Sequence, residues 1–313
     1  MKTSKLIILS LVALCFTGII VDSSFARPLP NGGGNPCCAT AAVTREAARH
    51  DADYDFWIAV GNALNDTEEP FFAAVAEAWA ERREAIELSH DQFRARLDIC
   101  AELGHGAYDP EIEEDEFSTT VDNPFLPYVP GRVLIYEKMT PDGLERVEVT
   151  LLADTVEIDE VECIVVNDVE MLDGEVVEDT VDWIAQHDNG DVWYFGEIAM
   201  NYEDGLLHDL DGSWKTGEDD AKPGILMKAS PAIGDLYRQE YFLNEAEDMA
   251  RVVSLSETVV VPAGTFTNCV MTEEWNPLEP EDSLEYKYYA DGIGMVLELD
   301  PASGERLELI QIL

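Results

Sequence analysis

Basic side chains are scarce in this chain. It has 19 Lys and Arg residues against 65 Asp and Glu among 313 residues, a formal net charge of −46. Such a charge repels phosphate groups, which excludes nucleic acid and anionic membrane surfaces as partners. The acids are spread along the chain, so they do not indicate a disordered tail. We interpret the acidic charge as an adaptation for solubility or for salty surroundings, where counterions screen the repulsion. Binding of a specific cation is the alternative interpretation.

Sequence motifs of the common catalytic sites are missing as well. The chain has no nucleophile elbow, no zinc-binding helix motif, no phosphate-binding loop and no pair of CxxC motifs. Its five histidines are scattered along the sequence. These absences favour a binding protein over an enzyme. A hydrolase stays a third hypothesis, because the carboxylates are numerous enough to supply the pair that glycoside hydrolysis needs.

A long apolar run occurs only at the start of the chain. Two lysines precede an apolar segment over residues 6–21, and Ser24 and Ala26 are small residues in the positions before a cleavage site. This order of features is typical of a secretory signal peptide. We therefore expect residues 1–26 to be removed. The mature protein would then start at Arg27 and be secreted, to act in the periplasm or outside the cell.

Cysteine is also rare. Five cysteines remain after the expected cleavage: Cys37, Cys38, Cys100, Cys163 and Cys269. Most of them should pair in an oxidising compartment, but an odd number leaves one free or bonded to another chain. Strand alternation predicts that Cys163 and Cys269 both point into the core, and it leaves open whether they bond to each other.

Helical periodicity covers residues 37–104. Apolar residues recur at spacings of three and four in two segments, which Asn65 and Asp66 separate and Gly104 ends. A short connection between helices of similar length predicts an antiparallel hairpin that packs through two apolar stripes. The first stripe consists of Val43, Ala47, His50, Tyr54, Trp57, Gly61 and Leu64, and the second of Phe72, Val75, Trp79, Ile86, Phe93, Leu97 and Cys100.

The ends of this hairpin bring cysteines together. Cys100 lies near the end of the second helix, beside the start of the first, so we predict a disulfide from Cys100 to Cys37 or Cys38. Residues 27–36 are rich in Pro and Gly and predict a flexible lead-in. The hairpin is also the surface through which we expect the chain to self-associate.

The helical period is lost after the hairpin. Residues 105–123, which include the run EIEEDE, form an acidic linker. Over residues 124–313, short segments alternate between polar and apolar residues and are separated by turn signals such as Asp173-Gly174. The sequence therefore predicts an α+β protein, with an N-terminal antiparallel helical hairpin followed by a mainly antiparallel β domain that forms a sheet or a partly open barrel.

Four segments carry a resemblance to a known family. Residues 261–266 read VPAGTF, residues 288–296 read YYADGIGMV, residues 123–127 read NPFLP, and residues 178–197 read EDTVDWIAQHDNGDVWYFGE. Over about residues 122–300 the chain resembles secreted bacterial proteins of largely unknown function. The resemblance implies a half-open antiparallel barrel like that of lipoprotein-carrier proteins, and it transfers no catalytic residue. Asp291 stands where the family usually has Pro.

Aromatic residues concentrate in the middle of the β domain. Core packing is the ordinary interpretation, and alternation predicts that Trp193 and Phe195 share one face of a strand. The alternative is a cleft on a concave apolar face of the sheet, which would hold a small hydrophobic ligand. In the competing arrangement, residues 212–232 fold over this face and fill it. The candidate ligand-binding residues are Trp183, Trp193, Phe195 and Trp214.

Closely spaced acids suggest calcium as the one candidate cofactor. Asp188 and Asp191 lie in one Asp/Asn/Gly segment, and Asp209 and Asp211 lie in another. Neither segment has the twelve-residue frame of an EF-hand, and a hairpin turn explains the first equally well. We therefore rank a secreted, non-catalytic binding or carrier protein first. An acidic extracellular protein that binds calcium or another cation is the second hypothesis.

Overall fold

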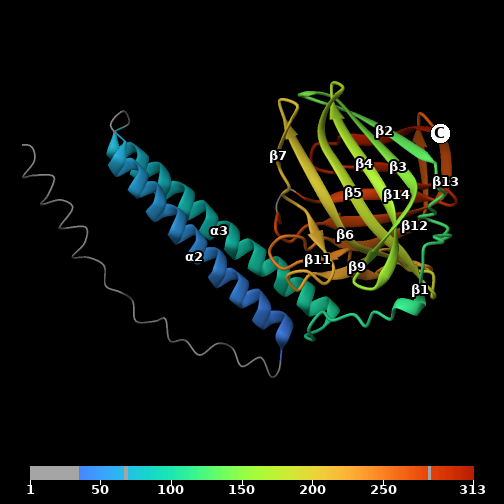
Figure 1. Ribbon diagram of the computed structural model, residues 1–313, viewed down its shortest axis with the longest axis horizontal. Coiled ribbons are helices and arrows are strands. Elements are labelled where there is room, and N and C mark those ends of the chain that lie inside the picture. Colours follow the sequence, from blue (N-terminus) through green and yellow to red (C-terminus); the bar gives the residue numbers. More distant parts are fainter. Residues whose placement is uncertain (1–34, 67–69, 281–282) are drawn as a thin grey trace, which may run out of the picture.

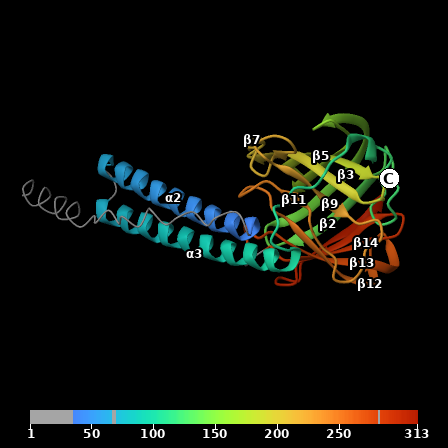
Figure 2. The same cartoon turned by 90° about the horizontal axis from the view of Figure 1, so that it is seen from below.

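A helical hairpin and an antiparallel sheet make up the described part of the computed structural model, residues 35–66, 70–280 and 283–313. Figure 1 shows the hairpin as a rod that extends to one side of the sheet, and Figure 2 shows the same arrangement from below. The α+β class and the order of the two parts are therefore confirmed. The expected signal peptide, residues 1–26, and nearly all of the lead-in, residues 27–36, lie outside the described residues.

The hairpin consists of α2 (Pro36–Asn65) and α3 (Phe71–Leu103), which contain 30 and 33 residues. The side chain of Asn35 caps α2 by accepting a hydrogen bond from the backbone N–H of Cys38 (3.0 Å). At about 1.5 Å per residue, each helix is roughly 45–50 Å long. Neither helix combines the length and hydropathy needed to cross a membrane.

A disulfide closes the open end of the hairpin. It joins Cys37, in the first turn of α2, to Cys100, near the end of α3, and the two Cα atoms are 5.8 Å apart. The predicted link from Cys100 is thus confirmed, with Cys37 as its partner. Cys38, Cys163 and Cys269 are free.

The two helices meet through small side chains, and the predicted packing through the apolar stripes is wrong for α2. The predicted stripe lies on the opposite face, where Tyr54 and Trp57 are 66% and 54% exposed. Both faces have helical spacing, so periodicity alone could not choose between them. Small residues let the two backbones approach closely, which large aromatic side chains would prevent. The buried positions of α2 are Ala41, Thr44, Ala52 and Ala63.

The stripe on α3 is divided between the interface and the solvent. Cys100 is buried as predicted, whereas Phe72 and Trp79 are exposed. The ring of Trp79 packs edge-on against Phe56 of α2, with 5.4 Å between the ring centroids. Large apolar side chains are therefore concentrated on the outer surfaces of the hairpin. The expectation that the hairpin self-associates stays a prediction.

One 16-stranded antiparallel sheet forms the described part of the β domain. Its main path runs in the order β10-β12-β13-β14-β15-β16-β2-β3-β4-β5-β6-β9-β11, while β1 pairs with β5, and β7 and β8 pair with β6. Most neighbours along this path are joined by hairpins, as the turn signals predicted. The strands are β1 (Phe117–Ser118), β2 (Val133–Thr140), β3 (Gly143–Ile158), β4 (Val161–Leu172), β5 (Glu175–His187), β6 (Val192–Glu203), β7 (Leu206–Asp209), β8 (Trp214–Lys215), β9 (Lys222–Met227), β10 (Leu236–Arg238), β11 (Glu240–Tyr241), β12 (Met249–Val261), β13 (Gly264–Trp275), β14 (Glu285–Ala290), β15 (Gly294–Leu299) and β16 (Arg306–Ile312).

The two ends of this path meet at one short segment, residues 236–241, which we call the closing segment. Its first half, β10, pairs with β12, and its second half, β11, pairs with β9. The sheet is therefore nearly closed into a barrel. The approach is tight at Gly224 of β9, because a Cβ atom there would lie 2.2 Å from the carbonyl oxygen of Gln239.

The base of the hairpin attaches beside the closing segment. Arg96 of α3 and Glu247 form an ion pair with 2.7 Å between Nη2 and Oε1, and their side chains are only 5% and 2% exposed. Just beyond α3, the hydroxyl of Tyr108 donates to the carbonyl oxygen of Pro223 (2.8 Å). The guanidinium of Arg238 lies 5.5 Å from the ring centre of Tyr108. The hairpin is thus anchored at one end and projects freely at the other (Figure 1).

The acidic linker covers part of the outer face of the barrel. Within it, a 3-10 turn at Glu114–Glu116 leads into β1. Ile112 and Phe117 pack against a cluster of buried residues on the outer side of β4, β5 and β6, which includes Cys163. Cys269 is buried in a different cluster. Both thiols are buried as predicted, and they are not bonded to each other.

We expect Cys100→Ser to destabilise the hairpin by about 2–4 kcal/mol, the usual contribution of a disulfide that closes a long loop. Unfolding followed by circular dichroism at 222 nm, with and without reductant, measures this difference. Cys38→Ser is the matched control and should have no such effect, because Cys38 is free. A non-reducing peptide map that links Cys100 to Cys38 would contradict the pairing.

Candidate functional site

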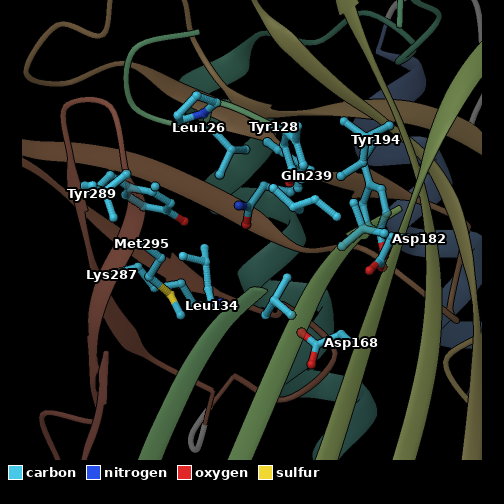
Figure 3. A pocket seen from close by; sticks show the side chains of 18 of the residues that line it. Leu126, Tyr128, Leu134, Asp168, Asp182, Tyr194, Gln239, Lys287, Tyr289 and Met295 are labelled. Atoms are coloured by element: carbon cyan, nitrogen blue, oxygen red, sulfur yellow. The ribbon is translucent and has the colours of Figure 1, made fainter. Parts of the chain in front are cut away.

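A cavity of about 310 Å³ lies inside the nearly closed barrel. Figure 3 shows Lys287, Tyr289 and Met295 on one side of it, facing Asp182 and Tyr194 on the other. Its walls come from both halves of the sheet, so the cavity depends on closure of the barrel. The lining residues are Leu126, Pro127, Tyr128, Leu134, Tyr136, Val149, Leu151, Val166, Asp168, Asp182, Ile184, Tyr194, Leu226, Gln239, Glu240, Asp248, Glu274, Lys287, Tyr289, Ile293, Gly294 and Met295.

A loop before β2 contributes one wall of the cavity, and Asn123 holds this loop in place. Asn123 is 2% exposed. Its amide nitrogen donates to the carbonyl oxygens of Gly190 (3.0 Å) and Lys228 (3.2 Å). Its side-chain oxygen accepts from the backbone N–H of Phe125 (2.9 Å) and Leu126 (3.2 Å). These bonds explain why the NPFLP segment begins with Asn: the amide directs Leu126 toward the cavity (Figure 3).

The cavity wall is part apolar and part acidic. Leucine, isoleucine, valine and methionine side chains supply the apolar part. Among the described residues that line the cavity, five are carboxylates and one is an ammonium group, that of Lys287. The predicted concave face is therefore present, but it is not purely apolar. The five carboxylates are Asp168, Asp182, Glu240, Asp248 and Glu274.

Glu274 is the best satisfied of these carboxylates. Its Oε1 accepts hydrogen bonds from the hydroxyls of Thr272 (2.6 Å) and Tyr289 (3.0 Å). Its Oε2 accepts from the amide of Gln239 (3.2 Å) and lies 3.4 Å from Nζ of Lys287. The charge of Glu274 is thus offset by four neighbours, which is the condition for burying a carboxylate without large cost.

Lys287 is shared among several carboxylates. Its Nζ lies 3.4 Å from Glu274, 3.6 Å from Glu285 and 3.5 Å from Glu298. Burial alone would lower the pKa of Lys287, but these three acids raise it well above its ordinary value. Lys287 therefore stays charged, and it forms ion pairs with three carboxylates.

The remaining carboxylates have fewer partners. Asp182 accepts a short hydrogen bond from the hydroxyl of Tyr194 (2.5 Å). Oδ1 of Asp248 is buried and has no hydrogen-bond partner among the residues that the structure describes. Burial, together with the neighbouring acids, raises the pKa of Asp182 and of Asp248 to about 6, and burial with Asp182 and Glu178 nearby raises that of Asp168 to about 8. Burial and the charge of Asp248 also raise the pKa of Glu240 well above its ordinary value.

Chemically, this cavity offers carboxyl groups and tyrosine hydroxyls next to apolar surface. Such a site suits a small molecule with hydrogen-bond donors at one end and an apolar body at the other. A tightly coordinated metal ion fits less well. In residues 35–66, 70–280 and 283–313, no group of three or more His, Cys, Asp and Glu side chains is placed to hold one.

The structure distributes the candidate aromatic residues over both faces of the sheet. Trp183, Trp193 and Phe195 pack in the outer cluster under Phe117, away from the cavity. Trp214 packs inside the barrel, edge-on to Tyr194 with 5.3 Å between the ring centroids. The predicted alternation of Trp193 and Phe195 against Tyr194 is confirmed. Trp183 and Trp214 also line a separate hollow of about 440 Å³.

The four candidate calcium ligands lie in two separate places. Oδ1 of Asp191 accepts from the backbone N–H of Ala229 (2.7 Å), and Asp188 belongs to the β5–β6 turn. Oδ1 of Asp209 accepts from Asn201 (2.8 Å) and from the backbone N–H of Asp211 (3.1 Å). These oxygens stabilise turns, and the structure does not bring the two pairs together.

The inner carboxylates and Asn123 were not among the residues singled out from the sequence. On β5, Asp182 and Ile184 share the inner face, and on β4, Val166 and Asp168 do so. A strand face that carries both acidic and apolar residues is usual on the solvent side of a sheet. The sequence pattern therefore indicated that these acids lie on the outer surface of the domain. Only the position of Asn123 within a segment of the resembled family could have drawn attention to it.

The raised pKa of Asp168 predicts how stability depends on pH. Asp182 and Glu178 on β5, Glu170 on β4 and Lys287 on β14 face this carboxyl. Between about pH 4 and pH 8 the folded protein holds a proton that the unfolded chain has released, because the pKa rises from 3.8 to about 8 on folding. The free energy of unfolding should therefore be highest below this interval and decrease as the pH rises through it.

Thermal unfolding at pH 5, 6, 7 and 8 in 0.5 M NaCl, which screens the surface charges, measures this dependence. Asp168→Asn should give a shallower decrease of the melting temperature, since Asn has no proton to lose. Asp142→Asn, at an exposed turn, is the control and should follow the unaltered protein. Equal slopes for Asp168→Asn and the unaltered protein would contradict the assignment.

Comparisons with protein-family models, with curated proteins and with solved structures found no match for this chain. The resemblance of residues 122–300 to secreted proteins with a lipoprotein-carrier-like β domain therefore stays an expectation drawn from the sequence.

Proposed function

We propose that this chain is a non-catalytic binding protein that holds a small molecule inside its barrel. The single observation that carries the proposal is the cavity of about 310 Å³, which is lined by apolar side chains, tyrosines and carboxylates. Its volume is at the lower end of the range typical of small-molecule sites, about 300–1,000 Å³. The signal-peptide features of residues 1–26 support a place of action outside the cytoplasm.

The competing prediction was that residues 212–232 fold over the concave face of the sheet and fill the space for a ligand. In the structure, this segment contains β8 and β9. Trp214 and Met227 enter the core, whereas Leu226 lines the cavity. The segment therefore narrows the interior and becomes part of its wall. Carboxylates without partners would be costly to bury in a solid interior. Their position on the inner face therefore supports an open space inside the barrel.

The experiment uses a substitution that fills the cavity. Leu226→Trp places an indole ring in the space that a ligand would occupy. Its matched control is Leu207→Trp, the same exchange at a position that is 54% exposed. Circular dichroism confirms that both variants fold.

The probe is prodan, a neutral dye whose fluorescence depends on its surroundings. We expect saturable 1:1 binding to the unaltered protein and to Leu207→Trp, and affinity at least tenfold weaker for Leu226→Trp. Equal binding by Leu226→Trp, or no saturable binding by the unaltered protein, would contradict the proposal.

A further inference from the structure

We infer that the ligand of this cavity is an organic cation, an amine with an apolar body whose nitrogen lies beside Asp248. This inference rests on the proposed function, because it names the chemical class that the proposed site would take. It depends on the balance of charge in the cavity, on one orphaned oxygen atom and on the shape of the wall.

The charge balance favours a positive ligand. The five carboxylates that line the cavity outnumber the one ammonium group among the described lining residues. That ammonium, of Lys287, is within 4 Å of Glu274, Glu285 and Glu298, and none of the other four lining carboxyls forms an ion pair with it within the described residues. Two of those four, Asp182 and Asp248, have a pKa of about 6 and are therefore ionised at pH 8. A bound cation would offset this charge.

Asp248 supplies the second observation. Its Oδ1 is buried without a hydrogen-bond partner in the described part of the chain, although its backbone carbonyl accepts from the N–H of Gln239 (2.7 Å). Buried carboxylate oxygens are almost always hydrogen-bonded, so an unpartnered oxygen on a residue that lines a cavity indicates a donor that the ligand brings. An ammonium group has up to three such donors.

The composition of the wall distinguishes an organic cation from a metal ion. A calcium ion needs six to eight oxygen ligands around one point. Within the described residues, no group of three or more potential ligands is placed for a metal. The apolar part of the wall, with Leu126, Leu134 and Met295, instead fits a hydrocarbon body. Tyrosine rings such as Tyr128 and Tyr289 add surface that attracts ammonium groups.

The test compares three probes with the same six-carbon chain: hexylamine, hexan-1-ol and hexanoate. Each displaces prodan from the unaltered protein at pH 8, where the amine is protonated. The buffer contains 0.5 M NaCl, so that general attraction to the acidic surface is screened. We expect hexylamine to bind at least tenfold more tightly than hexan-1-ol, and hexanoate to bind most weakly.

Two variants locate the effect in the cavity. Asp248→Asn removes the orphaned charge and should weaken hexylamine about tenfold, while hexan-1-ol is unchanged. Asp182→Asn removes a lining carboxylate of β5 that is ionised at pH 8, because its pKa is about 6, and keeps the experiment decisive if Asp248→Asn does not fold. Asp142→Asn removes an exposed charge and should change nothing.

The outcomes separate this inference from the proposed function. Equal affinity for all three probes, or tightest binding of hexanoate, overturns the inference while the binding cavity stands. Hexylamine that binds Leu226→Trp as tightly as the unaltered protein has bound the surface, which also overturns it. Failure of every probe, together with failure of prodan to bind, overturns both.

Discussion

The closing segment, residues 236–241, is the constraint on which the rest of the β domain depends. It pairs with β12 through its first half and with β9 through its second, so it joins the two ends of the sheet path. The missing side chain of Gly224 is what allows this approach. Without the segment, the inner face would be an open, concave sheet. With it, the same residues enclose an interior, and Gln239 and Glu240 are carried into the wall.

The stretch between the closing segment and β12 links the helical hairpin to the cavity wall. Arg96 of α3 forms an ion pair with Glu247, in the stretch between the closing segment and β12, and Glu247 in turn accepts from the backbone N–H of Asn244 (2.8 Å). Removing one partner of such a buried pair typically costs about 3–5 kcal/mol, because the other charge is left uncompensated. The next residue, Asp248, lines the cavity. The base of the hairpin and the acidic wall are therefore neighbours along the chain and in space.

The features that depend on local pattern were predictable from the sequence. Alternation and turn residues predicted most strands of the β domain. The similar lengths of the two helices, which bring the ends of the hairpin together, predicted the disulfide at Cys100. The buried face of α2 was not predictable, because Tyr54 and Trp57 have the same period as Ala52 and Ala63. In most helices the face with the large apolar residues is buried. In α2 the face with small residues is buried instead, because it allows close packing against α3.

The cavity itself was beyond local pattern. Asp168 and Asp182 become interior only because strands far apart in sequence close around them, and closure depends on strands as short as β10 and β11. Aromatic residues, the sequence signal we used for a ligand site, proved to be divided between the outer cluster and the inner core. Given a closed barrel, acidic residues that share the inner face of a strand with apolar residues are the sequence signal that would have located the site.

A crystal structure of the protein soaked with hexylamine tests the central claim most directly. A ligand cavity with an acidic wall predicts electron density for one molecule inside the barrel, with its nitrogen about 3 Å from the carboxylate of Asp248. Density confined to the outer surface, or an interior filled by the side chains of the cavity wall, would contradict it.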